Sequence, residues 1–416
     1  MPDETVVVKG VVEHPRSAGQ LAFSRSMGAY LWARAAAYLG FWAFAVVSAI
    51  VMYEATGSVA AVALITVAQF LPQFFLTPLS GVLADRGHVA TLIVSGFLLT
   101  GAGSTLLGCW LLAVGGPSGL AGPTPVLLAS LVVGLGFSVG SASTSAVLTV
   151  LVEPHELAVA IPLNSVPLMV ARALGPALAG LLLLIAGPAS ACLCAALLNF
   201  GCAAVMAWLR LPQRLAAEDE AGSVRLATAI AHLWQNKPLL LVLVGAAAIG
   251  IGAEPGVTLA PALAAQLGEV RMAGWIASSF GVGGVLGLLA LGTVRRRLGH
   301  AHGASGGLLL MSAGLLVVTI SGSVGLALAG MALAGVGMTI AHASNATLLQ
   351  LLTPPGLRGR VTALWFLCWL GARPVGAALI GALGDVWGVT AGLLGTQAVV
   401  AGVAVACWLV WRGVRE

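Results

Sequence analysis

A few charged side chains lie inside long apolar stretches of the 416-residue sequence. Each charged side chain at the centre of a membrane helix costs roughly 2.5 to 3.5 kcal/mol on insertion scales, so each is a candidate for function. Arg172 and Arg373 stand roughly 16 to 18 Å along their helices, near the middle, at a rise of about 1.5 Å per residue. We hypothesise that they hold an anionic or strongly polar substrate, or pair with an acid that moves. The alternative is a structural role, capping carbonyls near Pro176 or Pro374.

Glu254 is the only carboxylate well inside an apolar stretch, and Pro255 and Gly256 follow it directly. The proline predicts a kink with free carbonyl groups. Because burial disfavours the charged form of a carboxylate, a buried Glu254 is a candidate to take up and release a proton. The alternative is a solvated glutamate at the outer mouth of its helix.

Three further polar side chains complete the set of candidate cavity residues. Arg34 lies about five residues into the first apolar stretch, so we expect it to extend to the inner headgroups as an anchor rather than to bind a ligand. His342 and Asn345 are one helical turn apart and share a face. That face either lines a cavity, where an imidazole can change charge near neutral pH, or makes a hydrogen bond between helices.

The elements that must position these side chains are membrane-spanning helices. Hydrophobic residues make up 59% of the chain and charged residues 8%, whereas soluble domains carry about 25% charged residues. Unbroken apolar runs of about 20 residues favour helices over a barrel. Six runs precede a polar interval and six follow it, near residues 29–53, 59–83, 89–112, 124–151, 160–186, 189–210, 238–264, 272–294, 303–322, 325–351, 361–384 and 389–411.

The predicted fold is therefore an all-α membrane protein with twelve helices in two pseudo-symmetric six-helix bundles. The predicted boundaries are a tail at 1–27, a bundle at 28–210, a linker with a short interfacial helix at 211–237, a bundle at 238–411 and a tail at 412–416. At an offset of 201, Arg172 to Gly180 (RALGPALAG) aligns with Arg373 to Gly381 (RPVGAALIG). This alignment predicts a parallel internal repeat.

The distribution of basic residues predicts the orientation of the chain. With both termini inside, 15 of the 19 Lys and Arg residues fall in inner segments and only Arg271 falls in an outer loop. This positive-inside bias predicts a multi-pass inner-membrane protein with cytoplasmic N- and C-termini. The net charge of +5 then reflects orientation in the membrane and not binding to nucleic acid.

Several motifs carry a resemblance to a known family. Gly81 to His88 (GVLADRGH) stands between the second and third spans, and the fifth span contains Gly175, Pro176 and Gly180. With the six-plus-six layout, these segments resemble the loop signature and the fifth-helix exporter motif of the major facilitator superfamily. The stretches YEATGS at 53–58, AQFLP at 68–72 and LQLLTPPGLRGRV at 349–361 look like its drug:proton antiporter-3 branch.

The resemblance implies alternating access of two halves around a central site, with Gly81, Asp85 and Arg86 in a gating loop. The usual basic cluster of that loop is missing, so a charge lock there would rest on Asp85 and Arg86. Related chains often carry an acid after the Leu-Gly of the first helix, where this chain has Phe41. Proton coupling is therefore left to Glu254 or to a group that these motifs do not identify.

We accordingly expect export of amphipathic small molecules, coupled to protons, by a monomer in the lipid bilayer that needs no cofactor or metal. The alternatives are dedicated transport of one metabolite, such as a siderophore or an anionic solute, and a lipid-handling protein or membrane sensor. The chain has only two lysines, Lys9 and Lys237, and neither follows a glycine, so the phosphate-binding loop of an ATP-driven pump is absent. No hydrolase constellation occurs, and an enzyme is not expected.

Overall fold

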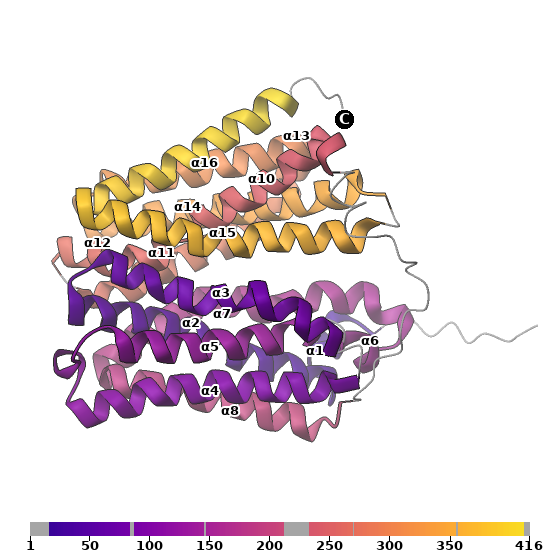
Figure 1. Cartoon of the computed structure of the whole chain (residues 1–416). Coiled ribbons are helices and arrows are strands. Elements are labelled where there is room, and N and C mark those ends of the chain that lie inside the picture. Colours follow the sequence, from indigo (N-terminus) through magenta and orange to yellow (C-terminus); the bar gives the residue numbers. More distant parts are fainter. Residues whose placement is uncertain are drawn as a thin grey trace, which may run out of the picture.

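Long helices predominate in the computed structural model, which describes residues 16–83, 87–144, 147–211, 233–268, 270–354 and 357–411. One group of helices, the N-half, occupies the lower part of Figure 1. Its elements are α1 (Ala18–Ala22), α2 (Met27–Thr56), α3 (Val59–Leu83), α4 (Val89–Val114), η2 (Pro117–Gly119), α5 (Thr124–Thr144), α6 (Leu148–Leu151), η3 (Pro154–Glu156), α7 (Leu157–Ile185) and α8 (Gly187–Trp208).

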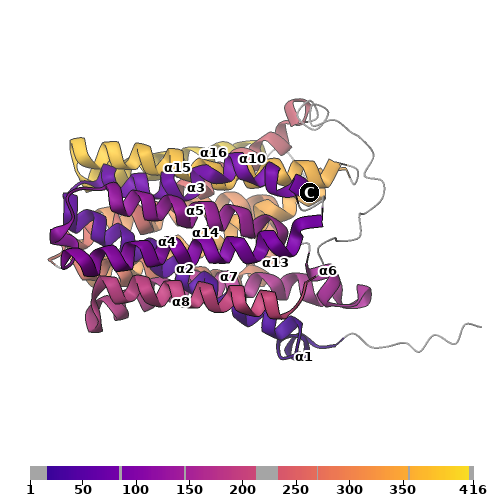
Figure 2. The same ribbon diagram turned by 60° about the horizontal axis from the view of Figure 1, so that its bottom comes forward.

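The second group of helices, the C-half, lies above the first in the same view (Figure 1). Its elements are α10 (Lys237–Gly252), α11 (Pro255–Thr258), α12 (Ala260–Gln266), η4 (Val270–Met272), α13 (Ala273–Thr319), α14 (Val324–Leu352), α15 (Arg358–Trp387) and α16 (Val389–Trp411). The described ends of the chain and of the segment between the halves lie at one end of the bundle (Figures 1 and 2). We call this the terminal end and the other the far end.

The predicted helices are confirmed, with two local differences. Nine described helices are long and apolar enough to cross a membrane, and α3 and α5 contain shorter apolar segments. The eighth and ninth predicted spans form one helix, α13, interrupted only at Gly299, whose φ of +71° is a conformation that a side chain would disfavour. The seventh span is broken at Ala253 and Glu254, as the proline predicts.

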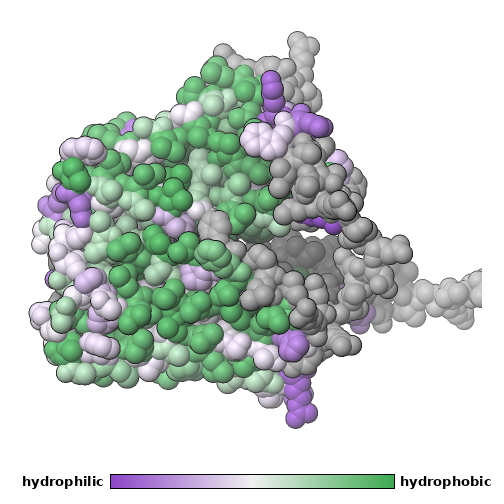
Figure 3. Space-filling view, in the orientation of Figure 1, coloured by the Kyte–Doolittle hydropathy of each residue, from purple (hydrophilic) through white to green (hydrophobic). Residues whose placement is uncertain are grey.

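Apolar side chains cover the flank of the bundle. The space-filling view shows them over both halves along the middle of the helices, with polar residues gathered towards the ends (Figure 3). The large apolar side chains that are exposed on the molecule include Leu184, Leu289 and Leu409, which water would solvate poorly. A multi-pass membrane protein accounts for this surface, since lipid is the solvent that such a flank requires.

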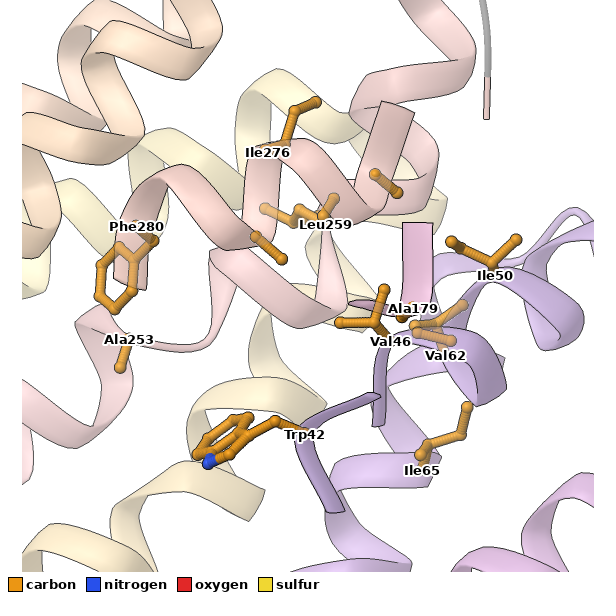
Figure 4. Packing of buried hydrophobic residues seen from close by; sticks show 14 of the residues in the cluster. Trp42, Val46, Ile50, Val62, Ile65, Ala179, Ala253, Leu259, Ile276 and Phe280 are labelled. Carbon is orange, nitrogen blue, oxygen red and sulfur yellow. The ribbon is translucent and has the colours of Figure 1, made fainter. Parts of the chain in front are cut away.

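The two halves touch through α3 against α15 and α7 against α13. Ser278 Oγ of α13 donates a hydrogen bond to the Ala173 carbonyl of α7 over 2.8 Å. Nearer the far end, a Cβ on Gly274 would come within 2.9 Å of the Gly180 Cα. Figure 4 shows buried residues of both halves close together, including Val46, Ala179 and Leu259. Towards the terminal end the molecule is instead hollowed between the halves (Figure 3).

Glycine also permits close packing inside the C-half. A Cβ placed on Gly283 of α13 would lie 1.9 Å from the Ala332 carbonyl oxygen of α14, too close for any real contact. Gly292, two and a half turns further along the same helix, has no atom within 4 Å of such a Cβ. The backbone of α14 therefore approaches α13 closely at Gly283 and leaves Gly292 open.

At the terminal end, an ion pair links the residue before α1's cap to η3, which precedes α7. Ser17 and Gln20 form a reciprocal capping box at the start of α1. The Arg16 guanidinium donates two hydrogen bonds to Glu156, with Nε–Oε1 at 2.5 Å and Nη2–Oε2 at 2.7 Å. These hydrogen bonds lower the pKa of Glu156 to about 2.

Replacing Gly283 with alanine should destabilise the protein by about 1 to 3 kcal/mol, because α14 must move away to admit the methyl group. Gly292→Ala is the matched control and should be neutral or slightly stabilising, since alanine favours a helix more than glycine does. The apparent melting temperature of the purified protein measures both. Equal melting temperatures for the two variants would contradict the close approach of α13 and α14.

Arg16→Ala should return the pKa of Glu156 towards its ordinary value of about 4.3 and release α1. In the unaltered protein this pair contributes stability above about pH 4, which is lost as the pH falls through about 2. Hydrogen exchange of residues 18–22 at neutral pH should be faster in the variant and unchanged in Arg297→Ala, an exposed arginine of the C-half. Unchanged exchange after Arg16→Ala would show that the pair does not hold α1.

Candidate functional site

A buried ion pair lies between α15 and the break that follows α10. Arg373 Nε donates to Glu254 Oε1 over 2.5 Å, and the two residues are 4% and 0% exposed. Thr258 Oγ1 donates to the other carboxylate oxygen over 3.4 Å. The alternative of a solvated Glu254 at the helix mouth is therefore wrong. Each partner stabilises the charge of the other, since breaking a buried pair by removing one partner costs about 3 to 5 kcal/mol.

Both central arginines pack against the same tryptophan. The guanidinium carbon of Arg172 lies 5.3 Å from the centre of the Trp42 ring, and that of Arg373 lies 5.6 Å from it. Phe280 stands 5.5 Å from Arg172, and Phe70 stands 4.2 Å from Arg373. Aromatic faces attract cations, so this aromatic lining stabilises two like charges at close quarters.

Trp42 reaches this position because α2 packs closely against α7. A Cβ on Gly175 of α7 would lie 2.7 Å from the Trp42 Cβ, so a side chain at this position would displace the tryptophan. The carbonyl of Pro176 lies 3.0 Å from where a Cβ on Gly274 would stand, and Gly180 faces the same glycine. The fifth-helix motif thus has two uses: Gly175 admits Trp42, while Pro176 and Gly180 contact the C-half.

In the C-half, Gly376 and Gly381 of α15 make the same kinds of contact as Gly175 and Gly180 of α7. Gly376 of α15 packs against Ile251 of its own half, as Gly175 packs against α2. Gly381 packs against Ala60 and Ala63 of α3 in the other half, as Gly180 packs against α13.

The central charges are not balanced. Arg172 is half-buried and, among the described residues, has no hydrogen-bond or ion-pair partner, whereas Arg373 is paired. Glu254 is the single carboxylate that the sequence places well inside a span. The centre therefore holds two positive charges and one negative charge, and in the described part of the chain Arg172 is the cation that makes no ion pair.

Arg34 does not act as the predicted headgroup anchor. It is 5% exposed and lies over the rings of Tyr30 and Tyr38, whose hydroxyls accept hydrogen bonds from it at 3.0 Å and 2.7 Å. It also donates to Asn164 of α7. Its Nε has no partner among the described residues. The two tyrosines stand four residues before and after it, on the same helical face, so they hold it inside the bundle.

His342 and Asn345 make contacts with the same aromatic wall of α15. Trp365 Nε1 donates to Asn345 Oδ1 over 2.6 Å, which is the interhelical hydrogen bond considered above. The His342 ring packs at a tilt against Trp365 and Trp369, with centroid distances of 5.0 and 4.5 Å and interplanar angles of 59° and 57°. Its Nε2 is buried without a partner in the described part of the chain.

The gating-loop residues Asp85 and Arg86 lie outside the described residues, and Gly81 lies in the last turns of α3.

The sequence analysis did not identify the aromatic residues of the site, which are Trp42, Phe70 and Phe280. Aromatic residues are ordinary in apolar spans, and only the fold brings these three to the arginines.

Solved structures show what fold this is. A transporter of the POT family in complex with thioalcohol-conjugated peptide superposes with a TM-score of 0.75 and 11% identity, over 95% of this chain and 98% of that one. A bacterial homologue of the iron transporter ferroportin in an inward-facing state gives 0.72 and 18%, over 92% and 98%. A bacterial homologue of the lysosomal transporter Spinster, inward-facing and unoccupied, gives 0.73 and 14%, over 92% and 96%.

These likenesses are below 25% identity and establish the fold, which is the major facilitator fold. No curated protein matches the sequence. A family model described as transmembrane secretion effector matches residues 19–412, nearly the whole chain. The protein therefore belongs to the transmembrane secretion effector family, as a multi-pass membrane transporter of the major facilitator type and not an enzyme.

Proposed function

We propose that this transporter exports amphipathic small molecules by alternating access, and that its preferred substrates carry an acidic group. The observation that supports this most directly is Arg172, a half-buried cation at the centre with no counter-charge among the described residues. A guanidinium binds carboxylate and phosphate groups through paired hydrogen bonds. A substrate anion would supply the missing charge.

The aromatic lining supports an amphipathic substrate. Trp42 and Phe280 flank Arg172, so a ligand whose acidic group meets the guanidinium would place its apolar part against aromatic rings. The hollow between the halves lies at the terminal end (Figure 3), which the positive-inside bias assigns to the cytoplasm of an inner-membrane protein. A substrate would thus enter from inside and leave through the far end.

Export, as the direction, rests on the family description and on the Gly175-Pro176 motif. The drug:proton antiporter-3 branch remains a proposal, supported by the motifs at 53–58, 68–72 and 349–361. An anion would also be driven outward by an interior-negative membrane potential, which is worth about 2.3 kcal/mol per charge at 100 mV. Export of a monoanion therefore needs no proton exchange.

Glu254 supports a second candidate, exchange of cationic amphiphiles for protons. A cation would compete with Arg373 for the carboxylate, and a proton would compete with both. Proton binding and cation binding would then exclude one another, which is the linkage that antiport requires. For an anionic substrate, proton binding and substrate binding would instead favour one another. Protonation of Glu254 would free Arg373 to help bind the anion. The charge of the substrate therefore decides the sign of proton coupling.

Arg172→Gln should abolish uptake of an anionic dye such as fluorescein into inside-out proteoliposomes, since the counter-charge for its carboxylate is gone. Arg172→Lys should retain part of the uptake, and Arg297→Gln, which removes an exposed arginine, should retain all of it. A rhodamine with the same ring system but positive charge should be moved poorly by the unaltered protein. Uptake of fluorescein that survives Arg172→Gln would refute the proposed role, and absence of any flux would favour a membrane sensor.

Glu254→Gln should leave potential-driven dye uptake in place and remove any response to an imposed pH gradient, since glutamine cannot take up the proton. The two driving forces are imposed separately, a potential by a potassium gradient with valinomycin and a pH gradient with the potential clamped. A pH response that persists in Glu254→Gln would show that another group carries the proton. Rhodamine uptake that depends on both the pH gradient and Glu254 would establish the second candidate instead.

A further inference from the structure

A carboxylate from the C-half caps a helix of the N-half at the far end. Asp385, near the end of α15, accepts a hydrogen bond from Ser58 Oγ through Oδ2 and one from the Val59 backbone N–H through Oδ1, both over 2.6 Å. Val59 is the first residue of α3, and Ser58 precedes it. The first N–H groups of a helix have no partner within it and carry the positive end of its dipole, so a carboxylate is stabilised there.

Ser58 has a second role at the same place. Its hydroxyl oxygen accepts a hydrogen bond from the Ala61 N–H over 3.0 Å, which is an ordinary cap of its own helix. The same hydroxyl donates its proton to Asp385. The start of α3 is therefore capped twice, once from its own half and once from the other half.

The contact lies where the halves must separate. Gly384 and Gly381, in the last turns of α15, pack against Val59 and Ala60 at the start of α3. A substrate leaving through the far end needs a path between the halves there. That path opens only if α15 and the start of α3 move apart, which breaks both hydrogen bonds of Asp385.

The sequence around Asp385 repeats the pattern of the gating loop. Gly381 to Asp385 reads GALGD, and Gly81 to Asp85 reads GVLAD, so both follow G-x-L-x-D. The first stands at the far end of α15, and Gly81 stands towards the terminal end of α3, the helix against which α15 packs. The same pattern thus occurs in α3 and in α15, at opposite ends of two helices that pack against each other across the interface between the halves.

We propose that Asp385 is the positioning residue that holds the far end of the transporter closed, by capping α3 across the two halves. The carboxylate acts on the balance between conformations and not on the substrate. Its loss favours the state that is open at the far end. This inference extends the proposed alternating access but does not depend on the substrate or on the coupling ion.

The test measures the separation of the halves at the far end without substrate. Spin labels at Ser118→Cys in η2 and Gln266→Cys at the end of α12, both exposed, report the distance between the halves in a cysteine-free background. Asp385→Asn should raise the ratio of the long-distance to the short-distance population about five-fold, the effect of losing about 1 kcal/mol of charge-assisted capping. Asp385→Glu should restore part of the short-distance population.

Two further variants keep the test decisive. Ser58→Ala removes one donor to Asp385 and should give a smaller shift in the same direction, and it replaces Asp385→Asn if that variant does not fold. Ser323→Ala removes an equivalent cap, from α14 within the C-half, and should leave the distances unchanged. Unchanged distances in a folded Asp385→Asn, or in Ser58→Ala where Asp385→Asn does not fold, would overturn the proposal. An equal shift in Ser323→Ala would do the same, because it would assign the effect to capping in general.

Discussion

The central site depends on one constraint: it holds two arginines, Arg172 and Arg373, but only one carboxylate, Glu254, inside an apolar bundle. Glu254 neutralises Arg373 at 2.5 Å and leaves Arg172 without a counter-charge among the described residues. Such a charge is tolerated only with aromatic faces and water beside it. Trp42 supplies the aromatic face, with its ring centre 5.3 Å from the guanidinium carbon of Arg172. The close packing of α2 against Gly175 serves the same site, because it brings the Trp42 ring to the two arginines.

The interfaces between the halves are built from small residues for a related reason. Glycine at 180, 274 and 381 lets backbones from the two halves meet without interlocking side chains. Surfaces of this kind give up few contacts when they separate, so the balance between conformations can be set by a few polar links. Asp385 and Ser278 provide such links in this state, one at the far end and one nearer the middle.

Much of the fold could be predicted from the sequence, because span length and apolarity are local properties. The repeat at an offset of 201 also placed Arg172 and Arg373 at equivalent depths. The Arg373–Glu254 pair could not be predicted, because its partners lie 119 residues apart and only packing brings them together. Arg34 was misread as an anchor because its depth was weighed without Tyr30 and Tyr38, whose spacing was the available signal. Asp385 was overlooked because carboxylates at helix ends are common, although its G-x-L-x-D pattern repeats that of the gating loop.

The charge that crosses the membrane in each cycle tests the role of Arg172 most directly. Proteoliposomes on a solid-supported membrane, given a jump in concentration of an anionic amphiphile without a pH gradient, report that charge as a transient current. A site with one unpaired guanidinium predicts a current whose sign matches inward movement of negative charge into the vesicles, and its absence in Arg172→Gln. A current of the opposite sign, or one that appears only with a pH gradient and an intact Glu254, would contradict an anion held by Arg172.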